Sequence, residues 1–374
     1  MLFTSGATVV HSSYTPSRQA ITVPAEVVAD FFIVEAQVAG RGPFQFLVDT
    51  GSSVSLVSPA LARQLGDAGH ATESSFAIRS SSQRTATLPA IVLPRLELGS
   101  ATFRRVPAAV FDFGDLSRQL GKRIDGIIGF SVFRDVVFTI DYPARRLVID
   151  PRGTIVARAS GTVDCYGDGG LPLAAVEVGG HRVVALIDTG SDSAVTLNSA
   201  TDAARLVRDS RRGSVRATLA GDEPQVIGRL DADVRIGPHR VERPPVEMAD
   251  GLPSLGNGVL RHFAVTFDPR HQLMTLRRDA SAPIQFAPQR SVGLGFAREE
   301  GEWRVAAIVP DTPAERSDIR VGDRCVRING QPTPAWPLER YQSLLRASET
   351  VTFTFASAGG READLRLPVV ELVR

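Results

Sequence analysis

Two short stretches of the 374-residue sequence hold residue types that can do chemistry together. Phe46-Leu47-Val48 leads into Asp49-Thr50-Gly51-Ser52, and Ala185-Leu186-Ile187 leads into Asp188-Thr189-Gly190-Ser191. An apolar run that ends in this way predicts a buried strand that delivers a carboxylate into a tight turn. A single copy is also compatible with an ordinary turn after a strand, because all four residue types favour turns. Two copies with the same apolar lead-in favour a paired site.

A pair of carboxyl groups is sufficient for hydrolysis. If Asp49 and Asp188 lie within about 3 Å of each other, they cannot both ionise cheaply, so one pKa rises and the pair shares a proton. Such a pair can take a proton from a bridging water and give one to a carbonyl oxygen or a departing amine. The chemistry needs no metal, cofactor or covalent nucleophile, and we expect none.

The repeat extends beyond the two motifs. Downstream of each one, an apolar segment containing glycine runs into two further strands, at residues 125–149 and at residues 253–276. Similarity in one register over this length predicts an internal duplication, in which each half contributes one carboxylate. The alignment matches Gly129 with Gly256, Arg134 with Arg261, Thr139 with Thr266, and Asp141 with Asp268.

The residues that follow each aspartate are expected to support it. Threonine hydroxyls can hydrogen-bond across the axis that relates the two halves, and glycines let the backbone turn sharply beside the carboxylates. Serine hydroxyls can bond the outer carboxylate oxygens. The predicted supporting residues are Thr50, Gly51, Ser52, Thr189, Gly190 and Ser191.

At these residues the sequence resembles the pepsin and retropepsin family of aspartic proteases, in which two Asp-Thr-Gly loops meet at a pseudo-twofold axis. The compact lobes and the Asp-Thr-Gly-Ser-Asp ending of the second motif are more similar to retropepsin, with both halves fused in one chain. The resemblance implies that Asp49 and Asp188 are catalytic. It also implies a cleft floor below them, made by Ile127, Ile128, Gly129, Leu255 and Gly256.

Many short strands at regular spacing predict an all-β fold with a closed or partly closed barrel in each lobe. Ser58 and Pro59 predict the start of a short helix, and Asn198–Val207 predicts a second one. Hairpins are expected at residues 72–89 and 215–230, where the family places flaps over its substrate. The first has no flap tyrosine; Phe76 could pack in its place, or the segment could be an ordinary exposed hairpin.

The C-terminal quarter resembles a PDZ domain. It contains Gly293-Leu294-Gly295-Phe296 and later a Gly-Asp and an Ile-Asn-Gly sequence, within residues 319–330. A glycine-rich turn before a strand exposes backbone N–H groups that can hold a peptide's terminal carboxylate while the peptide adds as a strand. The resemblance implies that Leu294, Gly295 and Phe296 bind the peptide. The alternative is a turn that only starts a strand.

These patterns predict an N-terminal arm, two protease lobes and a PDZ domain. The expected boundaries are 1–24 for the arm, 25–152 and 153–280 for the lobes, and 281–374 for the PDZ domain, with prolines marking the last linker.

Bulk composition excludes several classes of protein. A net charge of +1 gives no reason to expect nucleic acid or an anionic membrane as a partner. No apolar run approaches the roughly 20 residues that span a bilayer, and the six histidines show no metal-ligand spacing. Residues 1–10 make a poor signal peptide, so we expect a cytoplasmic protein, or one in the periplasm or cell envelope if an upstream signal has been removed.

Two functions fit the sequence. The first is an aspartic endopeptidase that acts on protein or peptide substrates, with a PDZ domain that binds the C-terminal tail of a substrate or partner. The second is a catalytically degenerate, PDZ-containing adaptor that binds peptides. The missing flap tyrosine and Ser254, at a place where the first half has an apolar residue, favour the adaptor. Retention of both Asp-Thr-Gly-Ser motifs favours the protease.

Overall fold

The architecture comes from a computed structural model of the chain. It describes residues 3–5, 12–15, 19–66, 70–79, 85–155, 161–167, 170–198, 201, 206, 211–218, 221–299, 302–336, 338–357 and 360–373.

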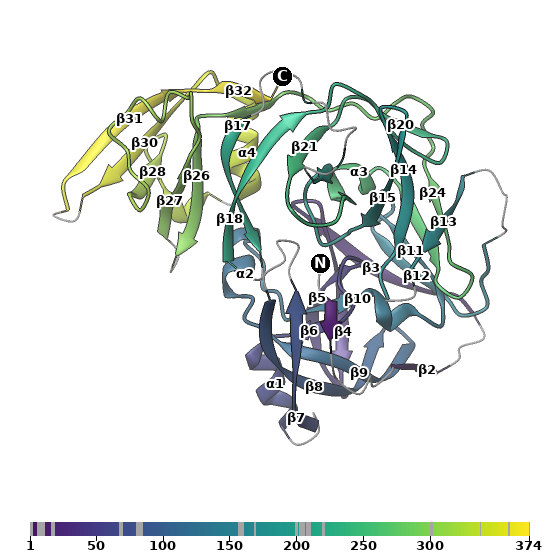
Figure 1. Ribbon diagram of the computed structural model, residues 1–374. Coiled ribbons are helices and arrows are strands. Elements are labelled where there is room, and N and C mark those ends of the chain that lie inside the picture. The colour runs from purple at the N-terminus through teal and green to yellow at the C-terminus, as the bar shows by residue number, and fades with distance from the viewer. Residues whose placement is uncertain are drawn as a thin grey trace.

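The first lobe resembles a β-barrel, and its last strand supports the loop that carries Asp49. The lobe lies at the bottom of Figure 1, in purple and blue. Its elements are β4 (Phe31–Val38), β5 (Arg41–Asp49), β6 (Ser55–Val57), α1 (Pro59–Leu65), β7 (His70–Arg79), β8 (Thr85–Leu98), β9 (Ala101–Val110), α2 (Gly114–Leu120), β10 (Gly126–Gly129) and the 3-10 helix η2 (Phe130–Phe133); the short strands β1 (Phe3–Ser5) and β2 (Ser13–Thr15) pair with β7 and β9.

The second lobe repeats this plan above the first one in Figure 1. Its elements are β14 (Leu173–Val178), β15 (His181–Ile187), β16 (Val195–Leu197), β17 (Arg211–Thr218), β18 (Gly221–Arg229), β19 (Val234–Ile236), β20 (His239–Val241), β21 (Pro245–Met248), β22 (Ser254–Leu255) and α3 (Asn257–Leu260).

A six-stranded antiparallel sheet joins the two lobes. Its order is β3 (Ile21–Val28), β12 (Arg146–Asp150), β11 (Val137–Asp141), β23 (Ala264–Asp268), β24 (Leu273–Arg277) and β13 (Thr162–Tyr166). Each half therefore contributes three strands. Strand β3 begins inside the segment that the sequence predicts as an arm, because its alternating buried side chains pair with β12.

The centre of this sheet shows the internal duplication directly. Thr139 of β11 pairs with Thr266 of β23, and their hydroxyl oxygens are 2.8 Å apart. The sequence alignment matches these same two residues, so the axis that relates the halves passes between them. Phe138 stacks on Phe267 beside the axis, with ring centroids 5.0 Å apart. One continuous hydrophobic core extends from this sheet into both lobes.

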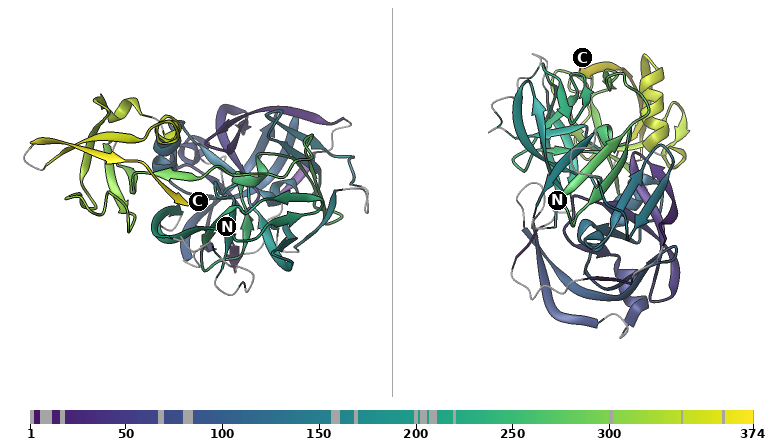
Figure 2. Two further views of the ribbon diagram at one scale, coloured as in Figure 1. Left: turned by 90° about the horizontal axis from the view of Figure 1, so that it is seen from above. Right: turned by 90° about the vertical axis from the view of Figure 1, so that its right-hand side faces the viewer.

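The C-terminal residues form a separate six-stranded sheet beside the lobes, at the upper left of Figure 1 and to the left in the view from above (Figure 2). Its hydrophobic core, built around Trp303 and Phe353, is distinct from that of the lobes. The elements are β25 (Gln289–Ser291), β26 (Leu294–Glu299), β27 (Glu302–Ile308), β28 (Arg324–Ile328), β29 (Gln331–Pro332), the 3-10 helix η3 (Thr333–Ala335), α4 (Leu338–Ala347), β30 (Thr350–Ala356), β31 (Glu362–Pro368) and β32 (Val370–Val373).

The chain is rich in strands with few, short helices, so the prediction of an all-β fold is confirmed. The first helix begins as predicted: Pro59 is its first residue, and the Ser58 hydroxyl accepts a hydrogen bond of 3.1 Å from the Leu61 N–H. Both predicted hairpins are present, as β7 with β8 and β17 with β18. The predicted helix at residues 198–207 falls mostly outside the described residues. Within the described ranges, no helix is both long enough and apolar enough to cross a membrane.

Truncation of Phe267 tests the joint between the lobes. Its ring is fully buried and contacts aromatic rings from the first half, so Phe267→Ala should lower the free energy of unfolding by about 3–5 kcal/mol. Denaturation by guanidinium chloride would measure the loss. Exposed Val321→Ala in the C-terminal domain is the control and should change stability by less than about 0.5 kcal/mol. A loss no greater than that of the control would show that the lobes do not depend on this stack.

Candidate active site

Each aspartate is delivered by a buried strand that runs parallel to a second strand of the same lobe. Strand β5 ends at Asp49 and pairs with β10, and Asp188 directly follows β15, which pairs with β22. Asp49 and Asp188 are only 7% and 6% exposed. The neighbouring strands hydrogen-bond the backbone of the two strands that carry the aspartates, so both carboxyl groups lie on a rigid support.

Four hydrogen bonds lock the two aspartate loops to each other. The Thr50 hydroxyl donates to the Ile187 carbonyl at 2.6 Å and accepts from the Thr189 N–H at 3.0 Å. The Thr189 hydroxyl donates to the Val48 carbonyl at 2.8 Å and accepts from the Thr50 N–H at 2.9 Å. These are the bonds across the axis that the sequence predicts for the threonines. They fix the distance and rotation between the lobes at the site.

The glycine of each loop makes room for the carboxyl group of the other. A Cβ atom at Gly51 would lie 2.2 Å from Oδ1 of Asp188, and one at Gly190 would lie 2.4 Å from Cγ of Asp49. Any larger residue would therefore overlap a carboxyl group. As a result, the two carboxyl groups approach closely enough to hydrogen-bond each other.

Burial makes this pair unusual in its acid–base behaviour. Loss of hydration, and after it the negative charge of Asp188, raises the pKa of Asp49 from 3.8 to about 7. The Gly51 N–H, which donates to Oδ1 of Asp49 at 2.8 Å, partly opposes this rise. Below about pH 7 the Asp49 carboxyl group therefore carries a proton, which it can share with Asp188.

The Ser52 hydroxyl does not bind a carboxylate in the way that the sequence predicts. The single hydroxyl proton of Ser52 is donated to the Val54 carbonyl at 2.6 Å, so the predicted bond from Ser52 to Asp49 is wrong. The Ser191 hydroxyl lies 2.8 Å from the Ser193 hydroxyl, and Ser193 is in turn 3.1 Å from the Thr196 hydroxyl. Both serines brace the turn that follows the aspartate, because short bonds to nearby residues are within easier reach of a seryl side chain.

The predicted floor residues lie directly beneath the loops. Ile128 and Leu255 are completely buried in the core shared by the lobes, and Ile127 joins Leu47 in a second cluster of the first lobe. Phe76 packs against this second cluster from the hairpin of β7 and β8.

Two glycines allow the floor to approach the loops. A Cβ atom at Gly129 would lie 2.8 Å from the Val54 carbonyl oxygen, and one at Gly256 would lie 2.4 Å from the Ser193 carbonyl oxygen. The polar Ser254 fits in its apolar counterpart's place: it is 6% exposed and pairs with Leu186.

Two residues of the site escape the sequence analysis. Asn257 is fully buried, and its Nδ2 donates to the Thr189 carbonyl at 2.8 Å. The hydroxyl of Tyr142, which comes from the other lobe, donates to Oδ1 of Asn257 at 2.5 Å. The alignment of the two halves does contain a signal, because Asn257 and Tyr142 stand opposite Phe130 and Pro269, and polar residues at otherwise apolar places suggest a specific partner.

The C-terminal sheet presents its predicted loop at one edge. Gly293 has a φ of +89°, and a Cβ atom there would lie 2.1 Å from Oγ1 of Thr312, so only glycine fits. The loop leads into β26, which pairs with β27 on one side. Leu294 is buried, whereas Phe296 is half-buried and contacts Tyr341 of α4, with ring centroids 5.9 Å apart.

The described residues include no group of three or more His, Cys, Asp and Glu side chains that could hold a metal ion. Burial raises the pKa of the thiols of Cys165 and Cys325 to about 12, so both remain protonated at neutral pH.

Replacing Asp49 should remove a pH-dependent loss of folding stability. Since its pKa is 3.8 when unfolded and about 7 when folded, the folded state binds more protons between these values, and stability falls as the pH rises through them. Thermal denaturation should show the wild-type Tm falling relative to that of Asp49→Asn from about pH 4 to pH 7. Exposed Asp279→Asn should keep the wild-type profile. Parallel profiles for Asp49→Asn and wild type would contradict the raised pKa.

The threonine bonds should contribute measurably to stability. Thr50→Val keeps the shape but leaves the Ile187 carbonyl and the Thr189 N–H buried without their partner, at a cost of about 2–4 kcal/mol in the free energy of unfolding. Thr50→Ser keeps the hydroxyl and is the matched control, with a much smaller loss. Urea denaturation compares the two, and equal losses would assign the effect to the methyl group instead.

Comparison with known protein families agrees with this geometry. The model of the aspartyl protease family matches residues 34–132 and 174–262, one segment in each lobe and together about half of the chain. The model of the PDZ domain matches residues 304–356. No curated protein matches the chain significantly. The two aspartate loops lie in equivalent parts of the two matched segments, so the chain belongs to the aspartyl protease family, with two lobes and a C-terminal PDZ domain.

Proposed function

We propose that the protein is an aspartic endopeptidase in which Asp49 and Asp188 together activate a water molecule. The observation that carries the proposal is the close approach of two buried carboxyl groups, each seated against the glycine of the opposite loop. A scaffold retained only for binding would gain nothing from this arrangement, since burying two acidic groups together costs free energy. Both aspartates are therefore assigned as catalytic.

The mechanism follows from the shared proton. The ionised carboxyl group accepts a proton from water, while the protonated one donates to the carbonyl oxygen of the peptide bond. As it loses this proton, the water oxygen bonds to the carbonyl carbon and forms a tetrahedral diol. The C–N bond then breaks: the carboxyl group that took the proton from water passes it to the departing nitrogen, and the other carboxyl group takes back the proton of one diol hydroxyl. The threonine bonds and the two loop glycines hold both carboxyl groups in place, so little reorganisation is needed during the reaction.

The PDZ domain implies peptide-binding partners. The backbone amides of Leu294, Gly295 and Phe296 would receive the terminal carboxylate of an extended tail, with Gly293 shaping the turn before them. A tail held there would raise the local concentration of the attached substrate at the cleft.

We also propose the boundaries of the units. The N-terminal arm is 1–24, the two lobes are 25–152 and 153–280, and the PDZ domain is 281–374. Strand β3 of the joining sheet already begins at Ile21, inside the arm.

Cleavage of a diverse peptide library tests the assignment. Wild type should cleave at acid to neutral pH and lose activity as the pH rises above about 7, where Asp49 loses its proton. Asp188→Asn and Asp49→Asn should each reduce kcat/KM by at least about a thousandfold, whereas exposed Asp279→Asn should not. Mass spectrometry would identify the fragments.

Two outcomes would contradict the proposal. Cleavage that persists in both aspartate variants would assign the activity to another site or to a contaminant. If the folded wild type cleaves nothing across this pH range, and an inhibitor of the pepstatin type also fails to raise its Tm, the adaptor function would be favoured instead.

A further inference from the structure

The two aspartate loops are supported in different ways, although the halves that carry them are duplicates. Alignment on Gly129 and Gly256 places Phe130 of the first half opposite Asn257 of the second. It also places Tyr142 opposite Pro269. Each of these pairs exchanges an apolar group for a hydrogen-bonding one, and in the folded chain both polar members lie beside the second loop.

Asn257 holds the second loop at two points. Its backbone N–H donates to the Ser191 carbonyl at 2.7 Å, and its Nδ2 donates to the Thr189 carbonyl at 2.8 Å. The side chain is fully buried, so no water competes for these bonds. The loop is therefore fixed on both sides of Gly190.

Tyr142 fixes the orientation of Asn257 from the other lobe. The tyrosine follows β11, is 4% exposed and packs edge-on against Phe32. Burial, followed by the nearby charge of Asp188, raises the pKa of the phenol well above its usual value, so its hydroxyl stays protonated and donates to Oδ1 of Asn257. An amide whose oxygen is engaged in this way must direct its NH2 group to the Thr189 carbonyl.

The chain of bonds ends at the Asp188 carboxyl group. The peptide unit between Thr189 and Gly190 accepts from Asn257 through its carbonyl and donates through its N–H to Oδ1 of Asp188, at 2.9 Å. Hydrogen bonding to a peptide carbonyl polarises the whole unit and strengthens its N–H as a donor. A stronger donor stabilises the charged form of the carboxyl group.

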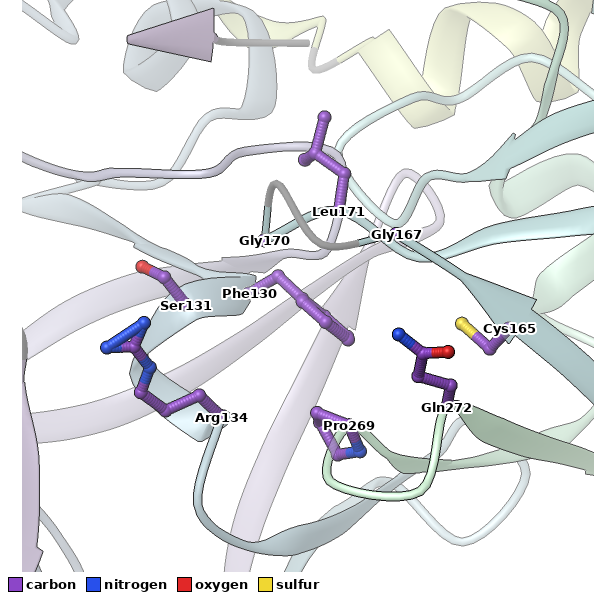
Figure 3. A pocket seen from close by; sticks show the side chains of 9 residues that line it. All are labelled: Phe130, Ser131, Arg134, Cys165, Gly167, Gly170, Leu171, Pro269 and Gln272. Atoms are coloured by element: carbon purple, nitrogen blue, oxygen red, sulfur yellow. The ribbon is translucent and has the colours of Figure 1, made fainter.

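Within the described part of the chain, the first loop has no corresponding hydrogen bond from an asparagine side chain. The Gly51 N–H donates to Oδ1 of Asp49 at 2.8 Å, but Phe130 occupies the position of the asparagine, and a phenyl ring cannot donate a hydrogen bond. Pro269 has no hydroxyl with which to repeat the role of Tyr142. Instead, a cavity of about 140 Å3 lies between Phe130 and Pro269 (Figure 3).

We propose that Tyr142 and Asn257 are positioning residues that hold Asp188 as the charged member of the pair and leave the shared proton on Asp49. Given the proposed function, Asp188 is then the group that accepts the proton from water, and Asp49 is the group that protonates the substrate carbonyl. The raised pKa of Asp49 has the direction that this assignment requires.

Amide proton chemical shifts test this relay, the chain of hydrogen bonds from Tyr142 through Asn257 to Asp188, without requiring protease activity. In deuterated, 15N-labelled full-length protein, Tyr142→Phe should move the Gly190 amide proton upfield, because its hydrogen bond to Asp188 weakens. The Gly51 amide is the internal counterpart and should move much less. Asn257→Leu provides a second variant with the same expected pattern. Tyr166→Phe, which removes an exposed hydroxyl bonded to Asp164, should move neither amide.

Kinetics provide the second readout. Tyr142→Phe should lower kcat about tenfold with little change in KM, and adding Asn257→Leu to it should cost no more than Asn257→Leu alone, because both act through one chain of bonds.

The two proposals can fail separately. If both glycine amides move equally, or neither moves, the positioning role is overturned whether or not the protein cleaves peptides. If Gly190 moves selectively but the wild type has no protease activity, the relay stands and the proposed function fails. If cleavage depends on both aspartates yet kcat is unchanged in Tyr142→Phe, the assignment of roles to the two aspartates is overturned.

Discussion

The close burial of two carboxyl groups is the constraint on which the rest of the structure depends. If both groups were ionised in this poorly hydrated site they would repel each other, so the site depends on other bonds that hold the lobes together there. The two threonines supply four such bonds at the loops, and the six-stranded sheet supplies a second attachment at its centre. Between these two attachments, the floor strands transmit the packing of the core to the loops.

Much of this scaffold can be predicted because it depends on local sequence. The apolar run before each aspartate forces a buried strand, and the glycine two residues after the aspartate leaves room for the opposite carboxyl group, where a larger residue would not fit. Ser58 and Pro59 define the start of α1 by their own conformational preferences. The duplication makes these signals stronger, since each appears twice and the copies pair across one axis.

Other features depend on partners that are distant in the sequence. On chemical grounds alone the hydroxyl of Ser52 could bond either a carboxylate or a carbonyl oxygen. Only the folded turn determines that it bonds the Val54 carbonyl. Tyr142 and Asn257 are 115 residues apart, and nothing in their immediate surroundings indicates that they meet. Their positions in the aligned halves mark them as exceptions, but the contact itself arises from the way in which the lobes pack.

Fusion of the two halves has a consequence for symmetry. A homodimer of identical halves would repeat every residue at both loops, so it would carry Asn257 and Tyr142 at both sites or at neither. A covalent connection makes the association of the halves independent of protein concentration, and it lets each half change without its partner. A homodimer of identical halves could not carry the difference between Phe130 and Asn257, whereas the fused chain can. With this difference, Asp49 and Asp188 have distinguishable surroundings although they are the same residue type.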